Sequence, residues 1–398
     1  MPIRWRDAMS HALYGPGGFF VAGGGPAAHF RTSVHASPAF ATALLRLLTQ
    51  VDAALGHPAR LDVVDVGAGR GELLSSLAGV AVGVSGEPAH SGRSGLIPPW
   101  AGSPETLTPA ASARALGSDP SSGTVRPSLA ERVRFTAVEY AERPENLPEE
   151  INWVSEIPEG ITGLLIATEW LDNVPLDAAV HTADGWRYVL VDPGSGAESI
   201  GELVSPADLD WLTTWWSSPD PSPGTDSDPR PGLPWTDATS DSESGFRAEI
   251  GRTRDEAWAN AVGKISRGLA LAVDYGHLSG DRPVDGTLTG YRGGRQVPPV
   301  PDGSSDVTAH VAMDSVASAG SEVARCAYSL VLQREALRAL GADGGRPPLS
   351  LAGTDPAGYV RALAAASAVA ELTDPAGLGG HWWLRQPVGI PQEPAVAR

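Results

Sequence analysis

The sequence predicts an α/β protein with a mostly parallel central sheet of the Rossmann-like kind. Residues 61–66 (LDVVDV) are apolar and β-branched, which is typical of a buried strand. A glycine-rich turn follows at residues 67–71, and the segment after it can open a helix. Residues 133–139, 163–169 and 269–274 are further strand candidates that each end in an acid. Strands of this kind, separated by helices, indicate an open sheet whose carboxyl ends line one crevice.

The first half of the chain divides into a helical part and a core. Residues 1–60 are predicted to form an N-terminal helical cap or lid. Within it, residues 38–55 have apolar side chains at helical spacing. Residues 61–175 are predicted to form the Rossmann-like cofactor-binding core. An insertion at residues 83–128 interrupts this core; it lacks any sustained period and is expected to be flexible.

The second half begins with an inserted hairpin and helical subdomain, predicted at residues 176–262. Residues 181–191 (HTADGWRYVLV) predict a hairpin with its Asp-Gly pair at the turn. A second flexible linker is expected at residues 217–244, which are rich in proline, serine and aspartate. Residues 263–398 complete the core and add C-terminal helices that pack on the sheet. Candidates for these helices are residues 328–332, 335–340 and 359–372.

The spacing of the glycines indicates which cofactor the turn accepts. Gly67, Gly69 and Gly71 permit backbone torsions that a Cβ forbids, and they let a ligand approach main-chain N–H groups at a helix start. A dinucleotide fingerprint has glycine at its first, third and sixth positions, but the sixth position here is Glu72. A nicotinamide dehydrogenase is therefore disfavoured. Glycine at positions one, three and five after a strand-end acid is usual in S-adenosylmethionine (SAM) methyltransferases, although a plain tight turn remains the alternative.

Two acids are the candidates for cofactor contacts beside the turn. Asp65 ends the strand, and with Ala68 of the turn it is assigned to the cofactor site; capping of the following helix is its alternative role. Glu139 ends the next good strand once residues 83–128 are set aside, so it is the candidate for the ribose hydroxyls. Glu87 has the ordinary spacing, but the glycine and proline around it indicate a turn.

Composition limits the classes of partner. Lys and Arg number 29 against 47 Asp and Glu, a net charge of −18, and no basic cluster is visible, so nucleic acid is not an expected partner. Cys326 is the only cysteine, which excludes an internal disulfide. No apolar run approaches the roughly 20 residues of a membrane helix, and the N-terminus does not resemble a signal peptide. We therefore expect a soluble, cytoplasmic protein without a membrane partner, and the sequence leaves its oligomeric state open.

Several motifs then occur in the order found in one family. These are residues 12–20 (ALYGPGGFF), 29–33 (HFRTS), the glycine turn, 138–139, 167–175 (ATEWLDNVP), 274–277 (DYGH), 286–292 (GTLTGYR) and 306–311 (DVTAHV). Together they resemble the MidA-type SAM-dependent methyltransferases, which include a mitochondrial complex I assembly factor that methylates an arginine. The resemblance implies a SAM methyltransferase fold, SAM as cofactor, and cofactor contacts from Thr32 and Ser33. His29 and Thr168 stand where the family usually has Asp and Asn.

Candidate catalytic residues follow from the same motifs. Glu169 and Asp172 are three residues apart just beyond a strand end, so a helical turn would point both carboxylates into the crevice. Such a pair can bind a guanidinium and raise the electron density of its attacking nitrogen. Their alternative roles are bonds to backbone N–H groups and helix capping. His277 and His310 are the general-base candidates because histidine titrates near neutral pH, or else they are structural. No spacing predicts a metal site.

Three functions remain open from the sequence. The first is a SAM-dependent methyltransferase acting on a protein side chain, with arginine as the expected target. The second is a SAM-dependent methyltransferase for a small molecule, and the third is a non-catalytic assembly or binding protein that keeps the fold. Tyr14, Phe19 and Phe20 either close an aromatic lid over the site or belong to the core.

Overall fold

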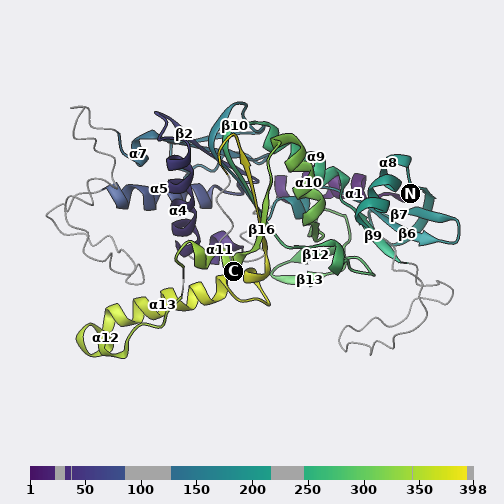
Figure 1. Ribbon diagram of the computed structural model, residues 1–398. Helices are drawn as coiled ribbons and strands as arrows, with labels where there is room; N and C mark the ends of the chain where they lie inside the picture. Colours follow the sequence, from purple (N-terminus) through teal and green to yellow (C-terminus); the bar gives the residue numbers. More distant parts are fainter. Residues whose placement is uncertain (23–31, 37, 86–126, 217–245, 343, 392–398) are drawn as a thin grey trace.

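The computed structural model describes residues 1–22, 32–36, 38–85, 127–216, 246–342 and 344–391 (Figure 1). Its centre is a seven-stranded sheet of order β16-β17-β10-β5-β2-β3-β4. β17 runs antiparallel to both of its neighbours, and the other pairs are parallel. The strands are β2 (Leu61–Val66), β3 (Val133–Val138), β4 (Ile151–Val154), β5 (Ile161–Thr168), β10 (Ile265–Asp274), β16 (Ser329–Leu332) and β17 (Trp382–Val388). The predicted α/β class with a mostly parallel sheet is confirmed.

Helices cover both faces of this sheet. Alternate side chains of β2 point to opposite faces, so Leu61 and Val63 join one apolar cluster while Val64 and Val66 join another. Figure 1 shows α4 and α5 on one side of the sheet and α9 and α10 on the other. The covering helices are α4 (Pro38–Ala54), α5 (Glu72–Ser85), α11 (Gln333–Ala339) and α13 (Pro356–Leu372) on the first face, and α9 (Arg252–Gly263) and α10 (Met313–Ala324) on the second. Burial on both faces explains why the strands read as continuous apolar runs.

A smaller sheet is attached beside the second face, and it contains the predicted hairpin. β6 (Asp177–Thr182) and β7 (Gly185–Val191) pair antiparallel across a two-residue turn. Their sheet has the order β1-β7-β6-β9, with β8 on the other side of β7. α1 packs on one face of it and α8 on the other. The additional elements here are β1 (Ile3–Arg4), α1 (Trp5–Tyr14), β8 (Glu198–Leu203), α8 (Pro206–Trp215) and β9 (Arg247–Ile250).

Short elements complete the described chain. Two small pairings, β11 with β15 and β13-β12-β14, follow the carboxyl end of β10. The strands are β11 (Gly276–His277), β12 (Thr289–Arg292), β13 (Arg295–Val297), β14 (Asp306–Thr308) and β15 (Val311–Ala312). The helices are α2 (Phe19–Ala22), α3 (Ser33–Ala36), α7 (Leu129–Arg132), α12 (Leu349–Thr354) and the 3-10 helices η2 (Leu171–Asn173), η3 (Ser279–Asp281) and η4 (Leu378–Gly380).

One predicted helix is wrong and two are confirmed. Residues 328–332 were expected to be helical, but Ser329–Leu332 form β16 at the edge of the main sheet. Each residue of β16 pairs with one of β17, from Ser329 with Arg385 to Leu332 with Trp382. This pairing with a strand some fifty residues later overrides local propensity. The predicted helices near 335–340 and 359–372 are α11 and α13.

The two predicted flexible insertions lie almost entirely outside the described residues. Residues 83–85 end α5, residues 86–126 are not described, and the linker at 217–244 is not described either. The alternative ribose acid Glu87 falls in the same undescribed stretch. Among the helices that the structure does describe, none is long and apolar enough to cross a membrane.

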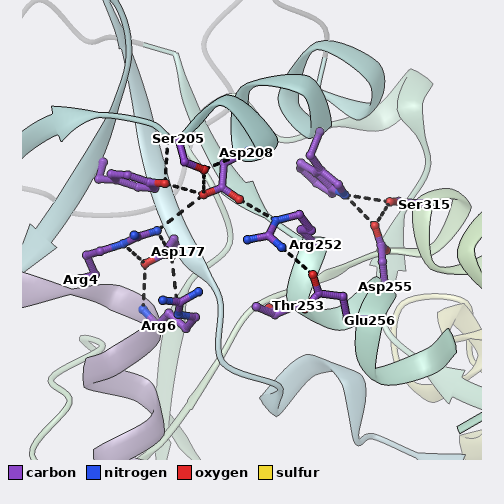
Figure 2. Close-up of polar contacts among 12 residues, drawn as sticks. Arg4, Arg6, Asp177, Ser205, Asp208, Arg252, Thr253, Asp255, Glu256 and Ser315 are labelled. Atoms are coloured by element: carbon purple, nitrogen blue, oxygen red, sulfur yellow. Dashed lines mark hydrogen bonds and ion pairs between the residues drawn. The ribbon is translucent and has the colours of Figure 1, made fainter. Parts of the chain in front are cut away.

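A polar network ties the N-terminus to the smaller sheet (Figure 2). Arg4 donates to both carboxylate oxygens of Asp177, and its guanidinium lies 3.7 Å from the centroid of the Tyr188 ring. Tyr188 donates its hydroxyl hydrogen to Asp208, which also accepts from Arg252 Nε at 2.8 Å. Burial opposes ionisation of Asp208, but these donors outweigh it and lower its pKa. The ionised carboxylate therefore joins α8, α9 and β7.

Replacing Asp208 with alanine is expected to lower the free energy of unfolding by about 3 kcal/mol, because it leaves the Tyr188 hydroxyl and the Arg252 guanidinium without their shared acceptor. Urea unfolding followed by circular dichroism measures the loss. Asp210→Ala is the matched control, since Asp210 is exposed on the same helix. Equal effects of the two substitutions would contradict the assigned role of Asp208.

Candidate active site

The main sheet changes its winding direction at β2. The chain continues from β2 to β3 on one side and later adds β5 on the other side. In open α/β sheets, ligands bind outside the carboxyl ends of the strands at such a point. A cavity of about 400 Å³ lies there, lined by residues that follow β2, β3, β4 and β5. The crevice expected from the sequence is present.

The glycine turn after β2 forms one wall of this cavity. Gly67, Gly69 and Gly71 have φ values of 71°, 60° and 78°, the left-handed region that strains other residues. A Cβ on Gly67 would lie 3.0 Å from Trp170 Cδ1, and one on Gly71 would lie 2.5 Å from Leu147 Cδ1. At Gly67 and Gly71, a side chain would therefore be strained by the left-handed backbone and would also press on a neighbouring side chain.

Two acids flank the turn. Glu139 accepts the Gly69 N–H through Oε2 at 3.0 Å and the Tyr140 N–H through Oε1 at 2.7 Å. Burial nevertheless leaves the pKa of Glu139 raised. Asp65 is 2% exposed, and its Oδ1 has no hydrogen-bond partner among the described residues. Burial, followed by the charges of Glu139 and Glu72, raises the pKa of Asp65 well above its usual range. Asp65 also lines the cavity, so its unpartnered Oδ1 can bond to a ligand there.

Glu169 lies where β5 ends and lines the cavity. Its φ of 49° is unusual for a residue with a side chain, so the turn holds it under backbone strain. Oε1 accepts the backbone N–H of Ser33 at 3.2 Å, which is the backbone-bonding alternative considered for this residue. Burial first, and then the charge of Asp172, raise the pKa of Glu169 to about 8. Thr32 also lines the cavity, while the buried Ser33 hydroxyl is bonded to Gln333.

Asp172 lies behind Glu169 and is not among the residues that line the cavity. Its Oδ2 accepts the hydroxyl hydrogens of Tyr275 and of Thr308, the latter at 2.7 Å. Burial raises the pKa of Asp172 although these two donors oppose the effect. Asp274 at the end of β10 accepts the N–H groups of Leu171 and Asp172, which fixes the short helix η2. The carboxyl group of Asp172 is thus held by Tyr275 and Thr308 behind the cavity wall.

A buried arginine supports this wall from below. Arg254 is 1% exposed and donates to main-chain carbonyls of four residues, Asp172, Val174, Ala309 and His310. Burial lowers the pKa of its guanidinium. Arg254 therefore joins η2 to the loop after β14, and its hydrogen bond to Asp172 goes to the main-chain carbonyl and not to the carboxyl group.

The two histidines proposed as bases lie away from the lining of the cavity. His277 is buried with Nδ1 2.7 Å from Arg282 Nη1, and burial together with that cation lowers its pKa to about 3. His310 is exposed, and its ring packs edge-on against Tyr275 at 5.2 Å between centroids. Its backbone N–H donates to Thr287. Their role as bases stays a prediction.

Aromatic side chains from the N-terminal segment cover part of the cavity. Tyr14 and Phe20 line it and stack at 5.6 Å, and Tyr14 also meets Tyr140 at 5.7 Å. Phe19 is instead buried in the core under α1. Tyr14 and Phe20 thus lie at the cavity and also pack against the core cluster, Phe19 belongs to that core, and the lid stays a prediction.

Sequence reasoning missed several residues of this site. Tyr140, Ile157 and Trp170 line the cavity, and two of them directly follow the predicted acids Glu139 and Glu169, which was the available signal. Arg254 and His381 carry no motif, because only the folded chain brings them to the carboxyl edge.

The switch-point cavity and its glycine turn define a Rossmann-like protein built to hold a nucleotide-type cofactor. Residues 120–330 match the profile of a family described as "Putative S-adenosyl-L-methionine-dependent methyltransferase", and the chain belongs to this family. The predicted resemblance to MidA-type methyltransferases is thereby confirmed.

Two solved structures share the fold. A COG1565 superfamily member from Burkholderia thailandensis, bound to S-adenosyl-homocysteine, is 21% identical with a TM-score of 0.65, covering 98% of this chain and 89% of the other. A native structure of an uncharacterized protein of that superfamily from the same organism is 23% identical with a TM-score of 0.60, covering 98% and 88%. A search of curated proteins gave no match.

Replacing Gly71 with alanine is expected to lower the free energy of unfolding by about 3 kcal/mol, because the new Cβ meets Leu147 and the alanine must adopt a positive φ. Gly79→Ala is the matched control. Gly79 lies in α5 with open space around its Cβ position, so this substitution should stabilise by about 1 kcal/mol. Urea titration of both variants checks the pair, and a neutral Gly71→Ala would refute the constraint.

Proposed function

We propose that this protein transfers a methyl group from SAM to a nucleophile, and that the nucleophile is an arginine side chain of a protein. The observation that carries the first part is the cavity at the switch point, which is lined by the left-handed glycines Gly67 and Gly69 and by Glu139 just after the neighbouring strand. Family membership and the S-adenosyl-homocysteine bound to the relative from Burkholderia thailandensis support the choice of cofactor.

The residues present fit SAM. The cavity volume of about 400 Å³ is within the range of small-molecule sites. The turn from Gly67 to Gly71 would hold the methionine portion, and the unpartnered Oδ1 of Asp65 fits a donor of the same ligand. Among the described residues, Glu139 Oε2 accepts one N–H, that of Gly69, so a further carboxylate lone pair can accept from a ribose hydroxyl. Trp170 and Ile157 offer apolar surface for adenine.

The chemistry divides between the cofactor and the chain. Bound SAM supplies an electrophilic methyl group, so the protein needs to hold the acceptor atom in line and to take up its proton. Glu169 is the residue that would accept this proton. It lines the cavity, and its raised pKa makes its carboxylate a stronger base than an ordinary one. Tyr275 and Thr308 hold Asp172 behind it.

The acidic surroundings support a cationic acceptor. The charge of Asp172 raises the pKa of Glu169, and the charges of Asp172 and Glu169 raise the pKa of Asp274 and of Asp306. A guanidinium near Glu169 would relieve part of this repulsion and present planar donors to a carboxylate. The family resemblance supports the same acceptor. Capture of a small molecule instead is one outcome of the experiment below.

Glu139→Gln is expected to weaken SAM and S-adenosyl-homocysteine binding about 30-fold, roughly 2 kcal/mol, because a neutral amide replaces a charged acceptor. Isothermal titration calorimetry measures both affinities. Glu142→Gln, an exposed change three residues away that does not line the cavity, should bind as the wild type. No heat of binding in the wild-type protein would defeat the proposed function itself.

Glu169→Gln is expected to reduce methyl transfer at least about 100-fold while leaving affinity for S-adenosyl-homocysteine nearly unchanged, since an amide cannot accept the proton. Wild-type transfer should rise with pH up to about 8, because the carboxyl group must be ionised to act and its pKa is raised to that value. The assay incubates labelled SAM with whole lysate and counts label in protein and in low-mass fractions.

The same assay separates the acceptors. Label in a protein band that acid hydrolysis returns as methylarginine supports the proposal, and label only in the low-mass fraction contradicts its second part. Glu145→Gln is the control, because Glu145 is exposed and does not line the cavity. A wild-type rate in Glu169→Gln with unchanged cofactor binding would remove Glu169 from the mechanism.

A further inference from the structure

The C-terminal part of the chain places a histidine against Glu169. His381 lies between η4 and β17, and its backbone is fixed on both sides: its N–H donates to Leu378 at 3.1 Å and its carbonyl accepts from Gln333 at 2.8 Å. The residue is 9% exposed. Its Nδ1 lies 4.0 Å from Glu169 Oε1, and its ring lies 5.6 Å from that of Tyr275.

The imidazole carries an unmet hydrogen-bonding requirement. Nδ1 of His381 is buried and has no hydrogen-bond partner among the described residues. A buried ring nitrogen in this state is costly, and Glu169 is the acidic group within 4.0 Å of it. Burial lowers the pKa of His381 to about 4, while the pKa of Glu169 is raised to about 8. At neutral pH the contact therefore joins a neutral imidazole and a protonated carboxyl group.

We propose that His381 is a positioning residue for methyl transfer: its unpartnered Nδ1 lies 4.0 Å from Glu169 Oε1, and a small rotation of the Glu169 carboxyl group in solution brings the two atoms to hydrogen-bond distance, with Nδ1 as the acceptor. The reaction proceeds from the ionised form of Glu169, whose share grows as the pH approaches about 8: the acceptor atom bonds to the methyl carbon, the C–S bond breaks with its electron pair left on sulfur, and the acceptor's proton passes to the Glu169 carboxylate. His381 stabilises the carboxylic acid so formed and exchanges no electrons. This inference rests on the proposed function, because it concerns the base that the function requires.

The other groups around the pair favour the same state. Asp172 from η2 disfavours the ionised form of Glu169 through like charge, and the charge of Glu169 in turn raises the pKa of Asp274 from β10 and of Asp306 from β14. From α3, the Ser33 N–H is the donor that opposes them. On the side of His381, the neighbouring titratable groups are Tyr275, whose ring lies 5.6 Å away, and His310, whose charge disfavours an imidazolium. The surroundings thus place the proton on the carboxyl group.

Nitrogen NMR of the imidazole rings tests the contact without any acceptor. The full chain is labelled with 15N-histidine, and the His381 signals are assigned by their loss in His381→Asn. In the wild type we expect Nδ1 to be unprotonated and its shift to move in one step with a midpoint near pH 8, as Glu169 loses its proton. In Glu169→Gln this step should disappear. A flat Nδ1 shift between pH 6 and 9, or a step that survives Glu169→Gln, would overturn the proposal.

Two variants separate positioning from packing. His381→Phe keeps the ring but removes the acceptor, so transfer of label should fall about 10-fold at unchanged affinity for S-adenosyl-homocysteine. In His381→Asn an amide oxygen occupies a place close to that of Nδ1, so transfer should stay near the wild-type rate. Equal losses in both variants contradict the inference. His57→Asn is the matched control. His57 precedes β2 and pairs with Asp52, neither residue lines the cavity, and the substitution should leave methyl transfer unchanged.

The outcomes for the pair and for the function are distinguishable. The pH-dependent shift of His381 Nδ1 needs neither SAM nor an acceptor. If this shift is present but the protein fails to bind SAM, the proposed function is wrong and the contact with Glu169 stands. If the protein binds SAM and transfers methyl groups but shows no such shift, this inference alone is wrong.

Discussion

The structure depends on how a Rossmann-like edge accommodates buried carboxyl groups. Glu169, Asp172, Asp274 and Asp306 converge where β5, β10 and β14 approach one another, and burial raises the pKa of each. Main-chain N–H groups, the Tyr275 and Thr308 hydroxyls and the Asn173 amide satisfy them in part. Because these donors are neutral, the edge keeps an acidic character that a bound cation can use. Burying these carboxyl groups beside the cavity therefore lowers the stability of the fold.

Contacts between distant segments complete that wall. Ser33 from the N-terminal part donates its N–H to Glu169, and its hydroxyl bonds to Gln333 from the C-terminal part. Gln333 in turn donates to the carbonyl of Leu372 and accepts from Trp383, so its amide is fully engaged. This chain of bonds explains why the strained turn at Glu169 can persist. The turn at Glu169 is thus held by Ser33 from the N-terminal part, which is itself held by Gln333 from the C-terminal part.

Local signals predicted the parts of the fold that are decided locally. The β-branched run at Leu61–Val66, the glycines after it and the Asp-Gly hairpin each depend on torsions and alternation within a few residues. Glu139 was found because it ends a strand of the same kind. Ser329–Leu332 was mistaken for a helix because its state is set by pairing with Trp382–Val388, which no local pattern reports. His381 and Arg254 escaped for the same reason: their roles exist only through contacts distant in sequence.

The buried acids of this molecule differ in whether an arginine side chain pairs with them. Asp52 and Asp208 are also buried, but each accepts from an arginine side chain, and the pKa of each is lowered. These carboxylates are ionised, paired and structural. Asp172 has an arginine nearby too, yet Arg254 donates to main-chain carbonyls instead of to the carboxylate, and the pKa of Asp172 stays raised. The guanidinium of Arg254 therefore holds the backbone of η2 in place without pairing with the carboxyl groups at this edge, so burial is not offset there as it is at Asp52 and Asp208.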